Sequence, residues 1–101
     1  MIVSIATFTG ETSEQLDEGV RHITGEVVPA MTGAAGLLSA YWLVDREKGE
    51  RLSVTVWENG DAAAAAWPGI GAKITAAREA AGLGQAASPN RSAQYEVVAS
   101  I

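Results

Sequence analysis

Residues 37–58 have the sequence LLSAYWLVDREKGERLSVTVWE, in which two runs of β-branched and aromatic residues flank a charged connector. These runs predict a β-hairpin with strands over 37–44 and 51–58, because Gly49 can supply the positive φ angle of the turn. In the second strand, aliphatic side chains alternate with polar and aromatic ones, so the two sets point to opposite faces of the sheet. We expect the aliphatic face to lie under helices; it consists of Leu52, Val54 and Val56.

The segment before the hairpin has the pattern of a strand followed by an amphipathic helix. Residues 2–9 are mostly β-branched and aromatic, which predicts a strand. Thr12 and Gln15 have the spacing of a capping box, which marks the start of a helix. Pro29 disfavours helical geometry at the residue before it, so we expect the helix to end or kink near Val28. The apolar stripe of this helix consists of Leu16, Val20, Ile23 and Val27.

A second helix and a last strand follow the hairpin. Asn59 can cap a helix that begins near Ala62, but Trp67-Pro68-Gly69 predicts a break or kink within it. Residues 93–101 then predict the fourth strand. The apolar stripe beyond the predicted break consists of Ile70, Ile74, Ala77 and Ala81.

This order of elements predicts one α+β domain over residues 1–101, with a ferredoxin-like βαββαβ topology. In that topology both helices pack on one face of a four-stranded antiparallel sheet, and the other face stays uncovered. Four strands of ordinary length present on the order of 400 Å² there, which is at the upper end of what a monomer leaves open. We therefore expect a homodimer that covers this face.

Composition narrows the classes of partner. The chain has twelve Asp and Glu residues, seven Lys and Arg residues and a formal net charge of -5, which argues against binding to nucleic acid or an anionic membrane. It has no cysteine, which excludes disulfides and thiolate chemistry. The first residues lack the basic start and long apolar core of a signal peptide, so the cytoplasm is the expected location.

Three segments together resemble the antibiotic biosynthesis monooxygenase superfamily of dimeric α+β barrels. They are the run from Gly36 to Arg46, the segment from Ser53 to Glu58, and the closing Tyr95-Glu96-Val97-Val98. The resemblance spans nearly the whole chain and implies that fold and a dimeric assembly. The superfamily includes cofactor-independent oxygenases that act on aromatic polyketides, haem-degrading enzymes and quinol-modifying enzymes, so the resemblance implies a small aromatic ligand.

The haem-degrading branch has an Asn late in its first strand, a Trp in its second helix and a haem-ligating His further along that helix. Here Thr7 stands at the Asn position, Trp67 lies close to the Trp position, and residues 70–84 contain no His. Because the proximal imidazole is missing, we expect no haem and no other cofactor.

Several side chains are candidates for ligand binding. Trp67 can stack on a planar aromatic ligand, or it can simply fill space beside the alanine-rich helix. Asn59, Arg78 and Lys73 can donate hydrogen bonds to a ligand, or they can serve as a helix cap and as solvated helix cations. The predicted ligand-binding residues are Trp67, Thr7, Trp42, Asn59 and Arg78.

Three further aromatic residues are predicted to lie in the dimer interface, where large aromatic side chains are enriched, and the alternative for Trp57 and Tyr41 is that their polar tips line the ligand cleft. These residues are Tyr41, Trp57 and Tyr95. Tyr41 and Trp42 should point to opposite faces of their strand, so one of the two can face the ligand cleft instead.

His22 is the only histidine, so any imidazole base or imidazole metal ligand has to be this residue. Glu18 and Glu26 at helical spacing place it on the charged face of the first helix, where we expect it to be solvated. No second His lies nearby in the sequence, and we predict no metal site.

Two functions remain open at this level. One is a cofactor-independent monooxygenase, in which the deprotonated substrate itself supplies electrons to dioxygen while the protein fixes the ring and excludes water. The other is a non-catalytic dimeric binding or accessory protein for a small apolar ligand. An open pocket beside Trp67 is required by both.

Overall fold

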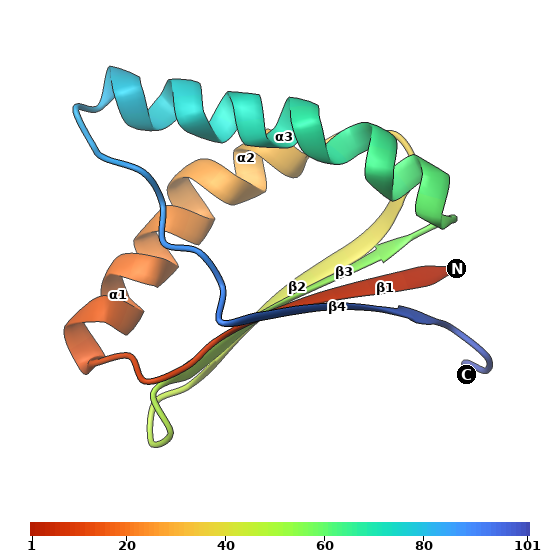
Figure 1. Ribbon diagram of the computed structural model, residues 1–101, viewed down its shortest axis with the longest axis horizontal. Helices are drawn as coiled ribbons and strands as arrows, with labels where there is room; N and C mark the ends of the chain where they lie inside the picture. The colour runs from red at the N-terminus through yellow and green to blue at the C-terminus, as the bar shows by residue number, and fades with distance from the viewer.

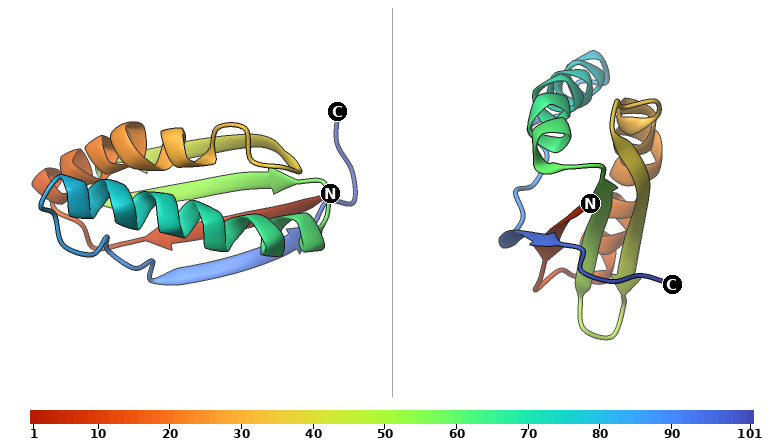
Figure 2. Two further views of the ribbon diagram at one scale, coloured as in Figure 1. Left: turned by 90° about the horizontal axis from the view of Figure 1, so that it is seen from above. Right: turned by 90° about the vertical axis from the view of Figure 1, so that its right-hand side faces the viewer.

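The computed structural model covers residues 1–101 and contains one four-stranded sheet in the order β2-β3-β1-β4, with neighbouring strands antiparallel. The strands are β1 (Ile2–Phe8), β2 (Leu37–Asp45), β3 (Glu50–Trp57) and β4 (Arg91–Glu96). The helical segments are α1 (Ser13–His22), η1 (Ile23–Val27), α2 (Val28–Met31) and α3 (Gly60–Ala80). All helices lie on one face of the sheet (Figures 1 and 2). This is the predicted ferredoxin-like βαββαβ arrangement.

The first helical run begins where the sequence predicts. Thr12 and Gln15 form the capping box, with Thr12 Oγ1 accepting from the Gln15 amide and Gln15 Oε1 accepting from the Thr12 amide. The expected end near Val28 is wrong, because the chain stays helical to Met31. The hydrogen-bond pattern changes at the π-helical turn η1, so Pro29 falls in the first turn of α2, where its missing N–H is not needed.

The predicted break at Trp67-Pro68-Gly69 is also wrong, because α3 is one helix over 21 residues with Pro68 inside it. A proline removes one hydrogen bond, the one its amide would donate to the carbonyl four residues earlier. Ala64 and Pro68 are both exposed, so water can bind the freed carbonyl. Asn59 caps this helix, as predicted, through Oδ1, which accepts from the Ala62 amide at 2.8 Å. No helix of the chain is long and apolar enough to span a membrane.

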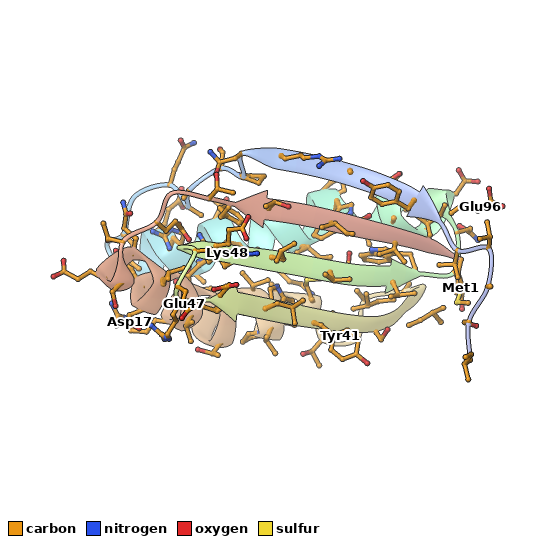
Figure 3. All side chains as sticks on the ribbon, turned by 90° about the horizontal axis from the view of Figure 1, so that it is seen from below. Met1, Asp17, Tyr41, Glu47, Lys48 and Glu96 are labelled. Atoms are coloured by element: carbon orange, nitrogen blue, oxygen red, sulfur yellow. The ribbon has the colours of Figure 1, made fainter.

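The aliphatic face of β3 does not lie under the helices, contrary to prediction. Trp57 and Thr55 face the helices, and Trp57 is fully buried in the core. Because side chains alternate along a strand, Leu52, Val54 and Val56 point to the opposite, open face. Figure 3 looks onto that open face, with the helices behind the sheet.

The core lies between the α2 end of the first helical run, α3 and the neighbouring end of β3. Trp57 and Met31 are its largest members, and both are almost completely excluded from solvent. Burial of these side chains supplies the main stabilisation of this half of the molecule. The core cluster consists of Ala30, Met31, Trp57, Ala63 and Ile70.

The last strand is shorter than predicted, since β4 ends at Glu96 and not at Ile101. Its partner β1 begins at Ile2, and the last backbone bond runs from the Val97 amide to the Met1 carbonyl. Residues beyond that point have no neighbouring strand to pair with. They turn away from the end of the sheet (Figure 2), and Val98 is 90% exposed.

A buried ion pair holds the opposite end of the sheet to α1. Arg51 is 6% exposed, and its Nε donates to Glu11 Oε1 at 2.7 Å. Its guanidinium carbon lies 3.8 Å from the centre of the Phe8 ring. Gly19 makes room for this group, because a Cβ there would lie 2.6 Å from Arg51 Nε.

Candidate functional site

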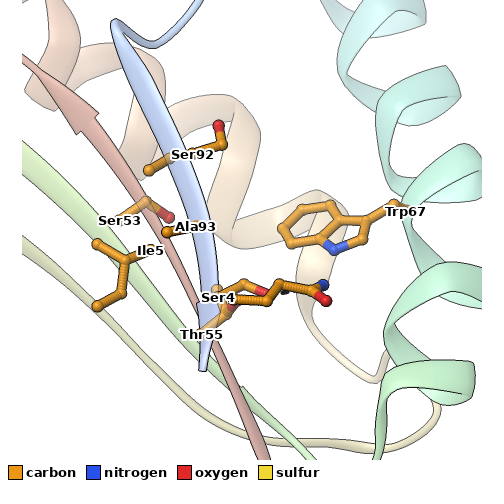
Figure 4. Close-up of a pocket in the computed structure, with 9 residues that line it drawn as sticks. Ser4, Ile5, Ser53, Thr55, Trp67, Ser92 and Ala93 are labelled. Carbon is orange, nitrogen blue, oxygen red and sulfur yellow. Dashed lines mark hydrogen bonds between the residues drawn. The ribbon is translucent and has the colours of Figure 1, made fainter. Parts of the chain in front are cut away.

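A pocket of about 360 Å³ lies between α3 and the helix-facing side of the sheet, over β1, β3 and β4. Figure 4 shows Trp67 projecting from α3 towards Ser4 and Thr55 on the sheet. Nine residues line the pocket: Ser4, Ile5, Ala6, Ser53, Thr55, Trp67, Ser92, Ala93 and Gln94. Alternation along the strands points the side chains of two of them, Ile5 and Ala93, to the opposite face of the sheet.

The strand register explains why this space is open. Ser4 is paired with Thr55 on one side and Gln94 on the other, and Ala6 is paired with Ser53 and Ser92. Paired residues on adjacent strands point to the same face, so these side chains form two rows beneath α3. Most of them are too small to reach the helix. The pocket is therefore floored by hydroxyl, amide and methyl groups.

Trp67 forms the roof of the pocket and also packs on the core. Its ring centroid lies 5.5 Å from that of Trp57, with the ring planes inclined by 59°. This tilted contact with a buried indole fixes one side of the Trp67 ring. Trp67 remains half-buried and lines the pocket. Trp67 therefore packs on the core and lines the pocket at the same time, and its stacking on a ligand stays a prediction.

Two hydrogen bonds organise the pocket floor. Trp57 Nε1 donates to Thr55 Oγ1 at 2.9 Å, and Gln94 Nε2 donates to Ser4 Oγ at 3.3 Å. None of the lining residues carries a titratable side chain. The site can therefore stack an aromatic ring and exchange hydrogen bonds with ligand oxygen atoms, but it contains no acid or base.

Four of the five predicted ligand-binding residues do not line this pocket. Thr7 pairs with Leu52 and Arg91 and so belongs to the open face of the sheet. Trp42 does point to the face opposite Tyr41, as predicted, but it packs against the core cluster. Asn59 is exposed and acts as the cap of α3.

Arg78 also lies outside the pocket, because it joins α3 to the first helical run. Its Nη1 donates to Glu26 Oε1 at 3.1 Å, and its Nε donates to the Gly84 carbonyl. Lys73 is solvent-exposed on α3. The predicted ligand contact of Arg78 is therefore replaced by an interhelix ion pair.

His22 is not solvated as expected, because it is partly covered and lies between Glu26 and Arg78. Its Nδ1 is 3.1 Å from Glu26 Oε1 and 3.3 Å from Arg78 Nη1. Burial opposes ionisation of the Glu26 carboxyl and is the largest single influence on it. The hydrogen bonds and charges of His22 and Arg78 together outweigh burial and hold the Glu26 pKa below its ordinary value. No group of three or more His, Cys, Asp or Glu side chains is placed to hold a metal ion.

The predicted interface residues separate into two groups. The prediction that Trp57 lies in the dimer interface is wrong, because Trp57 is 0% exposed and lies in the core of its own chain. Tyr41 and Tyr95 lie on the open face of the sheet and are both exposed. Figure 3 shows Tyr41 on β2 at the rim of this face.

The polar floor of the pocket was not predicted from the sequence. Ser4, Ser53, Thr55, Ser92 and Gln94 all fall at alternate positions of strands, a pattern that is visible in the sequence. These residues were not predicted to line a pocket, because the aliphatic face of β3, and not the polar face, was expected to lie under the helices.

No protein-family model matches the chain. Two curated proteins of Mycobacterium tuberculosis, the uncharacterized proteins MT2634 and Rv2557, are each 36% identical to it over 50 residues. The match covers 50% of this chain but 22% of each relative, so the chain spans only a minor part of their length.

Solved structures match nearly the whole chain. The monooxygenase ActVA-Orf6 of Streptomyces coelicolor, in complex with nanaomycin D, has a TM-score of 0.73 and 21% identity over 99% of this chain and 89% of that chain. SnoaB, a cofactor-independent oxygenase from Streptomyces nogalater, has a TM-score of 0.66 and 16% identity over 99% and 95% of the two chains. The heme-degrader MhuD of Mycobacterium tuberculosis, with two hemes bound, has a TM-score of 0.66 and 20% identity over 100% and 99%.

The structural neighbours of the chain are therefore antibiotic biosynthesis monooxygenase proteins, and the chain has their fold. This confirms the resemblance predicted from the sequence. At these identities the likeness concerns the fold alone, and the chemistry has to be argued from the pocket.

Proposed function

We propose that the chain is a monooxygenase-like domain that binds a small, planar, uncharged hydroxylated aromatic molecule in the Trp67 pocket. The observation that carries this proposal is an open space of about 360 Å³ between an indole and a floor of small polar side chains. Ligand sites usually have volumes of about 300 Å³ or more, with mostly apolar walls and a few polar groups. An indole face suits a planar ring, and the floor hydroxyls suit ring oxygens.

The reaction that fits this pocket is oxygenation without a cofactor. The substrate loses a proton and supplies the electrons, dioxygen is reduced, one oxygen atom enters the ring as a carbonyl, and the other leaves as water. The protein then has to orient the ring and exclude bulk water. Trp67 and the sheet surface support the first task, because a planar ring fits between them. Support also comes from the shared fold with ActVA-Orf6 and SnoaB.

Dioxygen uptake with a panel of hydroxylated anthrones and quinols tests this function. We expect uptake with the unmodified chain and at least a tenfold loss in Ala6→Leu, because a larger side chain in the floor occupies the ring position. Thr7→Leu is the control, since it places the same leucine side chain at the adjacent residue on the open face. Absence of uptake with every compound contradicts the oxygenase proposal.

A binding function without reaction is the second candidate, because no lining residue can act as a base. Quenching of tryptophan fluorescence by the same compounds, without dioxygen uptake, supports this alternative. If uptake does occur, its rate below neutral pH should follow the ionisation of the substrate, because the pocket contributes no titrating group.

We also propose that two copies of the chain pair through their open sheet faces. The central strands β1 and β3 present aliphatic side chains there, while Tyr41 is 60% exposed at the rim. Apolar patches of this kind usually mark an interaction surface. The apolar part of the face consists of Val3, Ile5, Tyr41, Leu43, Leu52, Val54, Val56, Ala93 and Tyr95.

Sedimentation over a range of protein concentrations tests this pairing. Val54→Asp places a carboxylate at the centre of the face. We expect the dissociation constant of the dimer to rise roughly 100-fold, because an unpaired charge is costly to bury. Ser13→Asp is the matched control, since it adds the same charge on the exposed side of α1. A chain that sediments as a monomer at every concentration contradicts the pairing.

A further inference from the structure

Two hydroxyl groups lie side by side at the centre of the pocket floor. Ser4 on β1 and Thr55 on β3 are paired residues, so their side chains point to the same face on neighbouring strands. Both line the pocket beneath Trp67 (Figure 4). Thr55 is 1% exposed, so it meets the pocket over only a small part of its surface.

The chain itself fixes how these hydroxyls can bond. An indole N–H can only donate, so the bond from Trp57 Nε1 makes Thr55 Oγ1 an acceptor. Gln94 Nε2 likewise donates to Ser4 Oγ. Neither hydroxyl donates a hydrogen bond to any group of the chain. Each therefore keeps its own proton available for a ligand.

We infer that Ser4 and Thr55 form a two-donor site for one oxygen atom of the ligand, and that this site favours the oxygen in its ionised form. The inference rests on the proposed function, since it assigns a role within the same pocket. Hydrogen bonds to an ionised acceptor are roughly twice as strong as those between neutral groups. Donors fixed in advance around a developing oxyanion stabilise it for the same reason.

The donor pair gives the pocket a way to deprotonate its substrate without a base. The O–H bond of a bound phenol or enol breaks, its electron pair stays on the oxygen between the two hydroxyls, and the proton leaves to water. No titratable side chain of β1, β3, β4 or α3 lines the pocket to compete for that proton. Trp57 acts as a positioning residue, because its N–H orients and polarises the Thr55 hydroxyl.

The pKa of a bound chromophoric phenol tests this inference. The probe is para-nitrophenol, whose ionised form absorbs visible light, titrated with the unmodified chain and with Thr55→Val, Ser4→Ala and Thr55→Ser. We expect the bound pKa to rise by about one unit in Thr55→Val and in Ser4→Ala, because each loses a hydrogen bond to a charged oxygen. Thr55→Ser keeps the hydroxyl and should restore the value of the unmodified chain.

The control is Thr7→Val, which removes a hydroxyl from the open face of β1 and should leave the bound pKa unchanged. Ser4→Ala leaves the Trp57–Thr55 bond intact, so it still tests the inference if Thr55→Val fails to fold. Equal bound pKa values in the unmodified chain, Thr55→Val and Ser4→Ala overturn the donor pair and leave the binding function standing. If the two substitutions weaken binding of the neutral and the ionised probe equally, the donor pair is also overturned. Failure of the unmodified chain to bind any phenol overturns both proposals.

Discussion

The two faces of β3 differ in chemistry, and the more polar face is the one that the helices cover. Beneath the helices, β3 carries Arg51, Ser53, Thr55 and Trp57, while its outward face is aliphatic apart from Glu50 at its first position. On the covered side, Trp57 fills the space over one half of the sheet. Over β1 and β4, short side chains leave the pocket open.

Within the layer between the sheet and the helices, some residues therefore stabilise the fold and others leave space for a ligand. Large apolar groups that meet between sheet and helices stabilise the fold, whereas small polar groups in the same layer leave room for a ligand. The aliphatic face has no partner within the chain, so its contribution to the free energy of unfolding depends on what covers it. Substitutions on the two faces therefore measure how much each face stabilises the fold.

The largest expected effect is at the core of the covered face. Trp57→Ala should lower the free energy of unfolding by about 3–5 kcal/mol, because it opens a cavity under α3. Urea unfolding followed by circular dichroism measures this loss. Tyr41→Ala on the open face should cost about 0.5 kcal/mol or less in dilute protein, since its side chain is already exposed. Equal losses for the two variants would mean that the faces do not differ.

A smaller effect is expected where α1 crosses the covered face. Gly19→Ala should cost about 1–3 kcal/mol, because the new Cβ meets the Arg51 guanidinium, which Glu11 and Phe8 hold in place.

The matched control is Gly25→Ala, which meets no atom within 4 Å and should be neutral or stabilising by about 0.5–1 kcal/mol. Thermal or urea unfolding of both variants distinguishes close packing from a general helix effect. A tolerated Ala at position 19 would show that Arg51 is free to move.

The smallest effect is expected at Glu26, which connects the helices above the covered face. Its pKa is lowered in the folded chain from an ordinary value of 4.5, so its ionisation stabilises the fold above that pH. The stabilisation is lost as the pH falls through the lowered folded pKa. Glu26→Gln should therefore cost up to about 1 kcal/mol at neutral pH and progressively less under acid conditions. Urea unfolding of the unmodified chain and of Glu26→Gln between neutral and strongly acidic pH checks this. A difference in unfolding free energy that grows as the pH falls would contradict it.

The local elements followed from local patterns. The capping box at Thr12 and the hairpin around Gly49 were predicted correctly, because each depends on residues that are neighbours in the sequence. The helix end predicted near Pro29 and the helix break predicted at Pro68 were wrong. At Pro29 the π-helical turn changed the local hydrogen-bond pattern, and at Pro68 the freed carbonyl lies on an exposed side of α3. A single proline costs less than the packing that keeps each helix in place.

The candidate site was predicted only in part, through Trp67. Thr7, Trp42, Asn59 and Arg78 were assigned to the ligand, but each has another place in the fold: the open face, the core, the helix cap and the ion pair with Glu26. The residues that do line the floor come from three strands. Their meeting depends on the register between β1, β3 and β4, which no single segment encodes.

Local sequence patterns suffice to predict the succession of strands and helices, the ferredoxin-like topology and the two chemically distinct sides of β3. Which of these sides the helices cover, and therefore where the pocket lies, depends on packing between elements. Alternation along a strand separates two faces but does not say what packs on either. That choice is made by Trp57 packing between α3 and α2, and α2 lies far from Trp57 in the sequence.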